Sequence, residues 1–174
     1  MKGRKETVVI DGYNLIYYWY NKQLKEVSLE ELRKELVEKL QEFQNYSGVK
    51  VILVFDAYKV RGMVKEENFD GLEVWFTKEG ETADTLIEKM VYNLKQKRKR
   101  VTVVTSDYAQ QQFVLGKGAI RKSSREFIND LLGVKAKIRN TITKNAEKVG
   151  NTIGGHLSPE KVKLLEKKFK NEKT

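Results

Sequence analysis

Cysteine is absent from the 174-residue chain, and histidine and proline each occur only once. A chain without cysteine forms no disulfides, thiolate zinc sites or cysteine nucleophiles, and it suits a reducing compartment, which we expect to be the cytoplasm. The single histidine, His156, excludes both paired imidazole catalysis and a multi-histidine metal site. Any chemistry must therefore depend mainly on carboxylates, hydroxyls and cations.

Long apolar runs are also missing. Residues 8–10 are apolar, but Asp11 follows at once, so this segment is too short for the core of a signal peptide. No stretch approaches the roughly 20 apolar residues that cross a bilayer, and we expect no membrane partner. Hydrophobic residues still make up 40% of the chain. That is enough for the core of one domain of ordinary size with an extension.

Positive charge is concentrated in the second half of the chain. Residues 95–174 carry 20 basic and 7 acidic residues, whereas residues 1–94 carry 14 basic and 17 acidic residues. A cationic region joined to a neutral or acidic one suggests a polyanion held beside a charged site, as in nucleic-acid enzymes. The alternative is a lysine-rich surface that serves only solubility.

Short β-branched runs alternate with longer segments of helical period, which favours βα units and a mainly parallel sheet. The expected strands cover residues 7–10, 50–55, 72–76 and 101–105. Three of them are almost wholly apolar, as is typical of strands covered by helices on both faces. The pattern predicts a layered α/β fold.

Capping signals predict the helices. A capping box at residues 28–31 opens a helix that ends at residues 47–48, and a second helix begins near Thr82 and ends in the basic run 95–100.

A second capping box, at residues 123–126, predicts a short helix that ends at Gly133. Lysines dominate after this point, and residues 150–155 are expected to form a linker. Ser158 and the only proline then predict the start of a last helix.

Acidic residues follow the predicted strands at their carboxyl ends. Asp11, Asp56 and Asp107 each follow a strand, while Glu81 and Asp84 lie where the connection after the third strand enters a helix. The carboxyl ends of parallel strands form the ligand crevice of an open α/β sheet, so these side chains can converge. Two ionised carboxylates about 4 Å apart repel by about 4 kcal/mol at an effective dielectric constant near 20. Such a cluster needs protons or a multivalent cation.

Oxygen ligands without cysteine or clustered histidine favour Mg²⁺ or Mn²⁺. A carboxylate-held ion beside a basic surface suggests phosphodiester hydrolysis by an activated water, which leaves a 5′-phosphate and a 3′-hydroxyl. Each acid taken singly also has a simpler interpretation as a turn or helix-cap residue. Glu81 is as readily a solvated loop acid as a ligand.

Motifs surround these acids. They are residues 8–14 (VVIDGYN), 54–57 (VFDA), 76–79 (FTKE), 81–84 (ETAD) and 103–108 (VVTSDY), with a glycine-containing basic segment at 116–124. Together they resemble the YacP-like NYN domains, bacterial relatives of the PIN ribonucleases, over residues 6–132.

The resemblance implies a PIN-like three-layer α/β/α fold with a mainly parallel central sheet. We expect this nuclease domain over residues 1–133 and a basic helical C-terminal extension over residues 134–174. The resemblance also implies an Mg²⁺-dependent endoribonuclease that cleaves mRNA in the ribosomal A site. RNA and the ribosome are the expected partners, with no preference for DNA.

Site residues follow from the same resemblance. It implies that Asp11, Asp56, Asp84 and Asp107 form the catalytic acidic cluster that binds the metal, with Glu81 as a further candidate ligand. Asn14, three residues after Asp11, is expected to orient that acid or to contact the scissile phosphate.

The segment 116–123 combines flexible backbone, three cations and a helix N-terminus, and it is a candidate phosphate-binding element. It lacks the third glycine of a dinucleotide fingerprint, and no P-loop motif occurs, so we expect no NAD or ATP site. The candidate RNA contacts are Arg121, Lys122, Lys117, Lys59 and Arg61, for which solvated turns are the alternative. The aromatic run 17–20 is expected to be core and rim rather than a base-stacking surface.

Two other functions stay open. The first is a non-catalytic RNA- or ribosome-binding module of the same fold, whose acids are structural. The second is a phosphatase or nucleotide hydrolase, which is disfavoured because residues 11–13 (DGY) lack a D-x-D nucleophile motif. Cleavage that Asp84→Asn abolishes without loss of RNA or ribosome binding would distinguish the nuclease from the binding module.

Overall fold

The computed structural model describes residues 6–56, 67–69, 71–78, 80–97 and 99–154. The chain divides into two compact units, residues 1–134 and residues 135–174. Within the described residues, no helix has the length and apolar character needed to cross a membrane. The predicted last helix from Ser158 lies outside the described residues.

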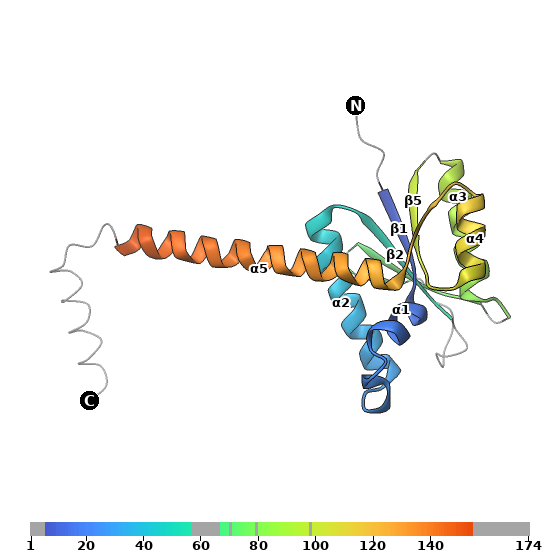
Figure 1. Cartoon of the computed structure of the whole chain (residues 1–174), viewed down its shortest axis with the longest axis horizontal. Coiled ribbons are helices and arrows are strands. Elements are labelled where there is room, and N and C mark those ends of the chain that lie inside the picture. Colours follow the sequence, from blue (N-terminus) through green and yellow to red (C-terminus); the bar gives the residue numbers. More distant parts are fainter. Residues whose placement is uncertain (1–5, 57–66, 70, 79, 98, 155–174) are drawn as a thin grey trace. The chain divides into compact units, whose positions relative to one another are not determined.

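A six-stranded sheet forms the centre of the first unit (Figure 1). Its order is β3-β4-β2-β1-β5-β6, and all neighbours are parallel except β3, which runs antiparallel to β4. The strands are β1 (Glu6–Asp11), β2 (Lys50–Phe55), β3 (Glu67–Phe69), β4 (Leu72–Phe76), β5 (Arg100–Val104) and β6 (Ile120–Lys122). The four predicted strands are confirmed as β1, β2, β4 and β5. The two unpredicted strands have three residues each and lie at the sheet edges.

Helices cover both faces of the sheet, which confirms the three-layer α/β/α prediction. The helices are α1 (Gly12–Trp19), α2 (Leu29–Ser47), α3 (Ala83–Gln96), α4 (Tyr108–Gly116) and α5 (Ser124–Gly154), with a 3₁₀ turn η1 (Gln23–Lys25). Val8 and Ile10 of β1 belong to the core cluster that contains α1, α2 and the start of α5, whereas Val9 belongs to the cluster that contains α3 and α4. This alternation follows from the two-residue side-chain period of a strand.

Helix α2 confirms its sequence signals at both ends. Ser28 and Glu31 form the expected capping box, and Gly48 ends the helix in the left-handed region at φ 68°. Five apolar residues, Leu32, Leu36, Val37, Leu40 and Phe43, are buried in the core. Burial stabilises by roughly 1.5–3 kcal/mol for each such side chain, so this face accounts for most of the helix's stability.

Helix α5 is longer than the sequence predicts. Ser123 and Glu126 form the expected capping box, but the helix continues to Gly154, so both the end at Gly133 and a linker beginning at residue 150 are wrong. A glycine inside a helix costs only about 1 kcal/mol relative to alanine. Apolar residues keep the helical period across Gly133, at Leu131 and again at Ile138. That periodicity and the helix-forming lysines outweigh one glycine.

Candidate functional site

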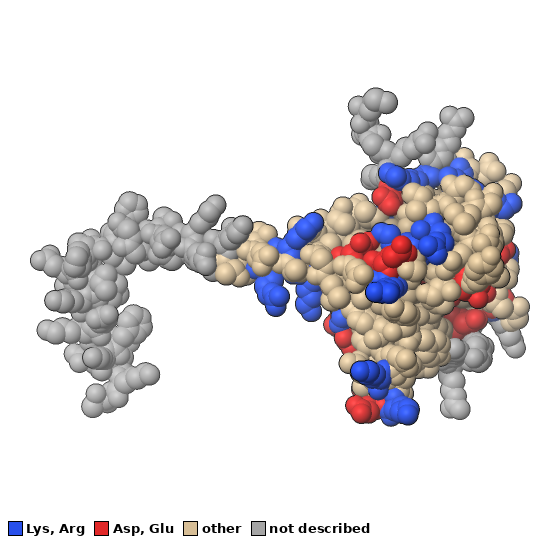
Figure 2. All heavy atoms as spheres, in the orientation of Figure 1, with Lys and Arg blue, Asp and Glu red and all other residues tan. Residues whose placement is uncertain are grey.

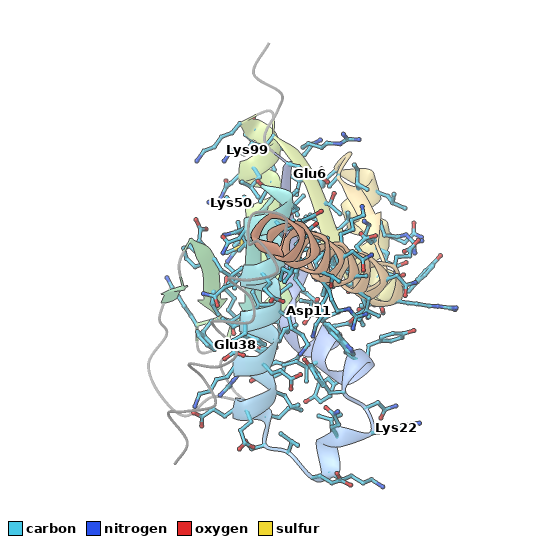
Figure 3. All side chains as sticks on the ribbon, turned by 90° about the vertical axis from the view of Figure 1, so that its left-hand side faces the viewer. Glu6, Asp11, Lys22, Glu38, Lys50 and Lys99 are labelled. Atoms are coloured by element: carbon cyan, nitrogen blue, oxygen red, sulfur yellow. The ribbon has the colours of Figure 1, made fainter. Side chains whose placement is uncertain are left out.

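Three aspartates lie at the carboxyl edge of three adjacent strands. Asp11 ends β1, Asp56 directly follows β2, and Asp107 follows β5 after a two-residue connection. Because β2, β1 and β5 are neighbours about 4.8 Å apart, the three acids come from within roughly 10 Å of sheet width. Figure 3 shows Asp11 at the opposite end of β1 from Glu6.

Asp11 is the N-cap of α1, and its Oδ1 accepts a hydrogen bond from the Asn14 backbone N–H at 3.0 Å. The next residue, Gly12, lies tightly against β2. A Cβ at this position would come within 2.3 Å of the Phe55 ring. Glycine is therefore required for α1 to begin directly at the sheet edge, and this fixes the position of Asp11.

Asn14 joins three segments around the site. Its side-chain Oδ1 accepts hydrogen bonds from the Ser106 backbone N–H at 3.0 Å and from Ser124 Oγ at 2.8 Å. The Asn14 backbone bonds Asp11, so one residue ties α1 to the loop before Asp107 and to the first residue of α5. Contact of Asn14 with a phosphate stays a prediction.

Asp107 and Asp84 are connected through Gln110. Asp107 is the N-cap of α4, and its Oδ1 accepts from the Gln110 backbone N–H at 2.9 Å. The Gln110 side-chain Nε2 donates to Asp84 Oδ1, in the first turn of α3, at 2.6 Å. One buried residue, 3% exposed, therefore contacts two of the predicted acids.

The electrostatics of Asp84 show that these acids share one environment. Desolvation raises the pKa of Asp84 above its ordinary value, and the negative charges of Asp107 and Asp56 raise that pKa further. The hydrogen bond from Gln110 opposes this rise in the pKa. The structure thus brings Asp56, Asp84 and Asp107 close enough for their charges to interact.

Asp56 is held from β4. The hydroxyl of Thr77, which is fully buried just after β4, donates to Asp56 Oδ1 at 3.1 Å. Asp56 is also the last described residue before the gap at 57–66. The predicted RNA contacts Lys59 and Arg61 fall in that gap and lie outside the described residues.

Glu81 has different partners from the aspartates. Its carboxylate accepts from Lys89 Nζ at 2.6 Å and from the Lys78 backbone N–H at 3.4 Å. The hydrogen bond from Lys89 is the largest of the effects that lower the pKa of Glu81. In this structure Glu81 is thus engaged in an ion pair, and its role as a ligand stays a prediction.

The donor chemistry fits a hard divalent cation. No three acidic or histidine side chains among the described residues lie close enough to enclose an ion by themselves. Mg²⁺, however, commonly binds through one or two carboxylates and keeps water and phosphate oxygens as its other ligands. The negative charges of Asp107 and Asp56 act against the charge of Asp84, and a bound cation would relieve that repulsion.

Part of the predicted basic segment, which was expected to have flexible backbone, forms a strand. Residues Ile120–Lys122 form β6, and the Lys122 carbonyl accepts from the Thr105 backbone N–H at 3.1 Å, two residues before Asp107. Arg121 donates to Gln111 Oε1 at 2.8 Å, while Lys122 forms an ion pair with Asp130. The third candidate, Lys117, lies 5.5 Å from the centre of the Phe113 ring.

The aromatic run divides between core and surface. Tyr20 is buried, whereas Tyr17 and Tyr18 are 39% and 49% exposed. The sequence reasoning missed another exposed ring, Tyr108, which is 73% exposed and directly follows Asp107.

Sequence reasoning also missed Gln110 and Thr77, whose side chains donate to Asp84 and Asp56. A signal for Gln110 exists, because it lies three residues after the N-cap Asp107, where a capping box places glutamine or glutamate. Thr77 carries no comparable signal, since its bond to Asp56 depends on the pairing of β2 with β4.

The fold and the acids at its carboxyl edge define a PIN-like nuclease domain. A family model of the YacP-like NYN domain matches residues 8–170. The chain is 41% identical to the protein YacP of Bacillus subtilis over 164 residues, which cover 93% of this chain and 95% of that protein. The chain belongs to the YacP-like NYN family.

Solved structures agree with this assignment. The crystal structure of Rae1 (YacP) from Bacillus subtilis matches with a TM-score of 0.71 and 40% identity, covering 95% of each chain. A crystal structure of a mutant of the same protein matches with a TM-score of 0.72 and 37% identity, covering 86% of this chain and 89% of that one.

Proposed function

We propose that this protein is a metal-dependent endoribonuclease that hydrolyses RNA phosphodiester bonds and cuts mRNA in the ribosomal A site. The observation that carries the proposal is the placement of Asp11, Asp56 and Asp107 at the carboxyl ends of adjacent strands, with Asp84 linked to Asp107 through Gln110. Carboxylates whose charges repel one another are unfavourable unless protons or a cation bind there. The family's nuclease fold supports the same chemistry.

In this proposal the chain's own residues position the reaction. One or two of the acids Asp84, Asp107, Asp56 and Asp11 would ligate the ion directly and the others through water. Thr77 and Gln110 fix two of these carboxylates through hydrogen bonds. When bound, a divalent cation supplies a water of lowered pKa and neutralises charge on the phosphate. Asn14 keeps the segment at Ser106 in place, so that Asp107 stays at the sheet edge.

Basic side chains bind the RNA backbone in the proposed complex. Arg121 and Lys122 belong to β6, which is adjacent to β5 and therefore to the strand that precedes Asp107. Because phosphate contacts position an RNA without reading its bases, these residues supply affinity rather than sequence selectivity.

The proposed ribosomal location in the cytoplasm rests on the family resemblance and on the charge of the second half of the chain. The described part of α5 carries exposed Lys135, Lys137 and Arg139, and Figure 2 shows basic side chains along this helix. Ribosomal RNA would be the polyanion that such a helix binds, with an affinity that falls as salt increases.

Cleavage on translating ribosomes tests the proposal. Wild type and Asp84→Asn are compared with Mg²⁺, without it, and after addition of Mn²⁺, and the RNA ends are mapped. Intact subunits must be verified in each sample, because Mg²⁺ also maintains ribosomes. We expect cleavage by wild type only, with 5′-phosphate and 3′-hydroxyl ends. A 2′,3′-cyclic phosphate, or unchanged cleavage by Asp84→Asn, would contradict the mechanism.

A non-catalytic RNA- or ribosome-binding module is the second candidate. It is favoured by one observation, namely that Asp11 and Asp107 both cap helices and thus have structural roles of their own. This module would bind RNA or ribosomes equally well as wild type and as Asp84→Asn, and neither protein would cleave. For an endoribonuclease, Asp84→Asn should instead abolish cleavage while RNA or ribosome binding persists.

A further inference from the structure

We propose that Gln110 is a positioning residue that holds the carboxylate of Asp84 in place for the metal ion. This inference rests on the proposed function, because it assumes that Asp84 is a metal ligand. Gln110 itself is not assigned to the metal or to the RNA.

The contacts of Gln110 make it the link between two helices that carry predicted acids. Its side-chain amide donates from α4 to Asp84 Oδ1 on α3 at 2.6 Å, and its backbone N–H donates to Asp107 Oδ1 at 2.9 Å. The bond to Asp84 uses one carboxylate oxygen. That oxygen is Oδ1, and no described residue donates to Oδ2.

The hydrogen bond from Gln110 to Asp84 counteracts the repulsion among the acids. The charges of Asp107 and Asp56 act against the charge of Asp84. An ionised Asp84 side chain without a donor would therefore rotate away from the other two acids and toward water. The buried amide of Gln110 opposes that rotation, so Asp84 stays beside the acids with which it would share an ion.

The burial of Gln110 argues against a purely structural role. The residue is 3% exposed, and its Oε1 is buried without a hydrogen-bond partner among the described residues. A buried carbonyl oxygen without a partner opposes folding. Methionine has the same length and would leave no unpaired oxygen, so packing alone does not call for an amide at this position. What the amide adds is its hydrogen bond to the Asp84 carboxylate, which also contributes to stability.

The first test measures metal binding without RNA. Gln110→Met is compared in the full chain with wild type and with Gln112→Met, a matched substitution at an exposed position of the same helix. Mn²⁺ binding is followed by calorimetry, and the unfolding temperature is recorded for each protein. We expect Gln110→Met to bind Mn²⁺ about 10- to 100-fold more weakly, the range typical for residues that orient a metal ligand. Gln112→Met should bind like wild type.

A double-mutant cycle tests whether the effect passes through Asp84. In the Asp84→Asn background, Gln110→Met should cause no further loss of Mn²⁺ affinity, because the carboxylate that Gln110 positions is gone. An equal fold-loss in both backgrounds would overturn the proposal, as would wild-type affinity in Gln110→Met. If Gln110→Met does not fold, Gln110→Leu takes its place in the same cycle.

RNA cleavage separates this proposal from the proposed function. We expect Gln110→Met to lower kcat while KM for RNA is unchanged. If wild type binds Mn²⁺ in a Gln110-dependent way but does not cleave RNA, the positioning role stands and the endoribonuclease assignment fails. If wild type cleaves and Gln110→Met binds Mn²⁺ and cleaves like Gln112→Met, the assignment stands and the positioning role fails. If wild type binds no Mn²⁺, the positioning role is overturned.

Discussion

The aspartates at the carboxyl edge of the central sheet have different partners from the glutamates at its other end, although Glu81, after β4, pairs with Lys89. Away from the carboxyl edge, Glu73 forms an ion pair with Lys50, and Glu6 accepts from Thr102 at 3.0 Å. Figure 3 shows Glu6 and Lys50 toward the end of the sheet opposite Asp11. At the carboxyl edge, by contrast, Asp84 interacts with two other acids and with a neutral amide. An ion pair between a surface acid and a lysine stabilises a fold only modestly. Several carboxylates placed close together instead indicate a binding site for a cation.

Removal of one carboxylate from each end of the sheet is the strongest test of this comparison. Asp84→Asn should lower RNA cleavage by more than about 100-fold, because loss of a ligand exceeds the 10- to 100-fold effect of losing a residue that orients one. Glu73→Gln, which breaks the pair with Lys50, should leave cleavage unchanged and stability within about 1 kcal/mol. Cleavage rates and denaturant unfolding of both variants measure this. Similar losses of cleavage in the two variants would remove the functional distinction between the ends.

A second test changes the backbone at Gly12, which supports the carboxyl edge of the sheet. Gly12→Ala places a Cβ within 2.3 Å of the Phe55 ring, so the ring or α1 must move. We expect a destabilisation of about 1–3 kcal/mol, typical of overpacking, and a loss of cleavage because Asp11 moves with α1.

The matched control for this variant is Gly133→Ala in α5. A Cβ at that position would meet nothing within 4 Å, so alanine should stabilise the helix by up to about 1 kcal/mol. Urea unfolding compares the two variants. Equal stability of Gly12→Ala and wild type would show that the contact with Phe55 does not constrain the site.

The dependence of stability on pH sharpens the comparison further. The pKa of Asp84 is raised in the folded protein, so the folded state binds this proton more tightly than the unfolded chain. Stability attributable to Asp84 is therefore highest below the unfolded pKa and falls as the pH rises through the folded pKa. Asp84→Asn should unfold at a higher temperature than wild type near neutral pH, and the difference should shrink in acid.

The effect of a metal ion on stability should depend on pH over the same range. Mn²⁺ should raise the unfolding temperature of wild type near pH 7 and less so in acid, because protons compete for the carboxylates. EDTA should reverse the shift. Thermal unfolding with and without the metal measures it, with Glu73→Gln as the control that keeps the response. A shift of the same size in Asp84→Asn would contradict a site at the carboxyl edge.

The smallest expected effect concerns Arg121. Arg121→Ala should weaken RNA binding several-fold and lower the slope of log affinity against log salt by about 1, because one phosphate contact is lost. Arg139→Ala, at an exposed position of α5, is the comparison for a basic residue of the second unit. Binding titrations at several salt concentrations measure both. An unchanged slope in Arg121→Ala would exclude this residue from the RNA contact.

The central strands were predictable because continuous β-branched runs leave few alternatives, and α2 was predictable because capping box, apolar period and terminal glycine agree. Short elements were not. Strand β6 has one apolar residue in three, and α1 and α4 begin at aspartates that look equally like turn residues. The extent of α5 was misjudged because two glycines suggest ends that a continuing helical period overrides.

The positions of the aspartates were predictable because strand ends of a parallel sheet converge. Their hydrogen-bond donors were less so. Thr77 reaches Asp56 only because β4 pairs with β2, and Gln110 reaches Asp84 only because α4 packs beside α3. Such contacts depend on tertiary placement. Sequence pattern therefore gives the charges of this site but not the neutral groups that hold them.

The helix caps at Asp11 and Asp107 divide the site into a rigid half and an adjustable half. Rotation of either capping carboxylate would release a backbone N–H at the start of a helix, at a cost of about 1 kcal/mol. Among the described residues, the hydrogen-bond donors to Asp84 and Asp56 are the side chains of Gln110 and Thr77. While the ion exchanges during turnover, Asp11 and Asp107 would therefore keep the positions that folding gives them. Asp84 and Asp56 would adjust to a changing phosphate geometry.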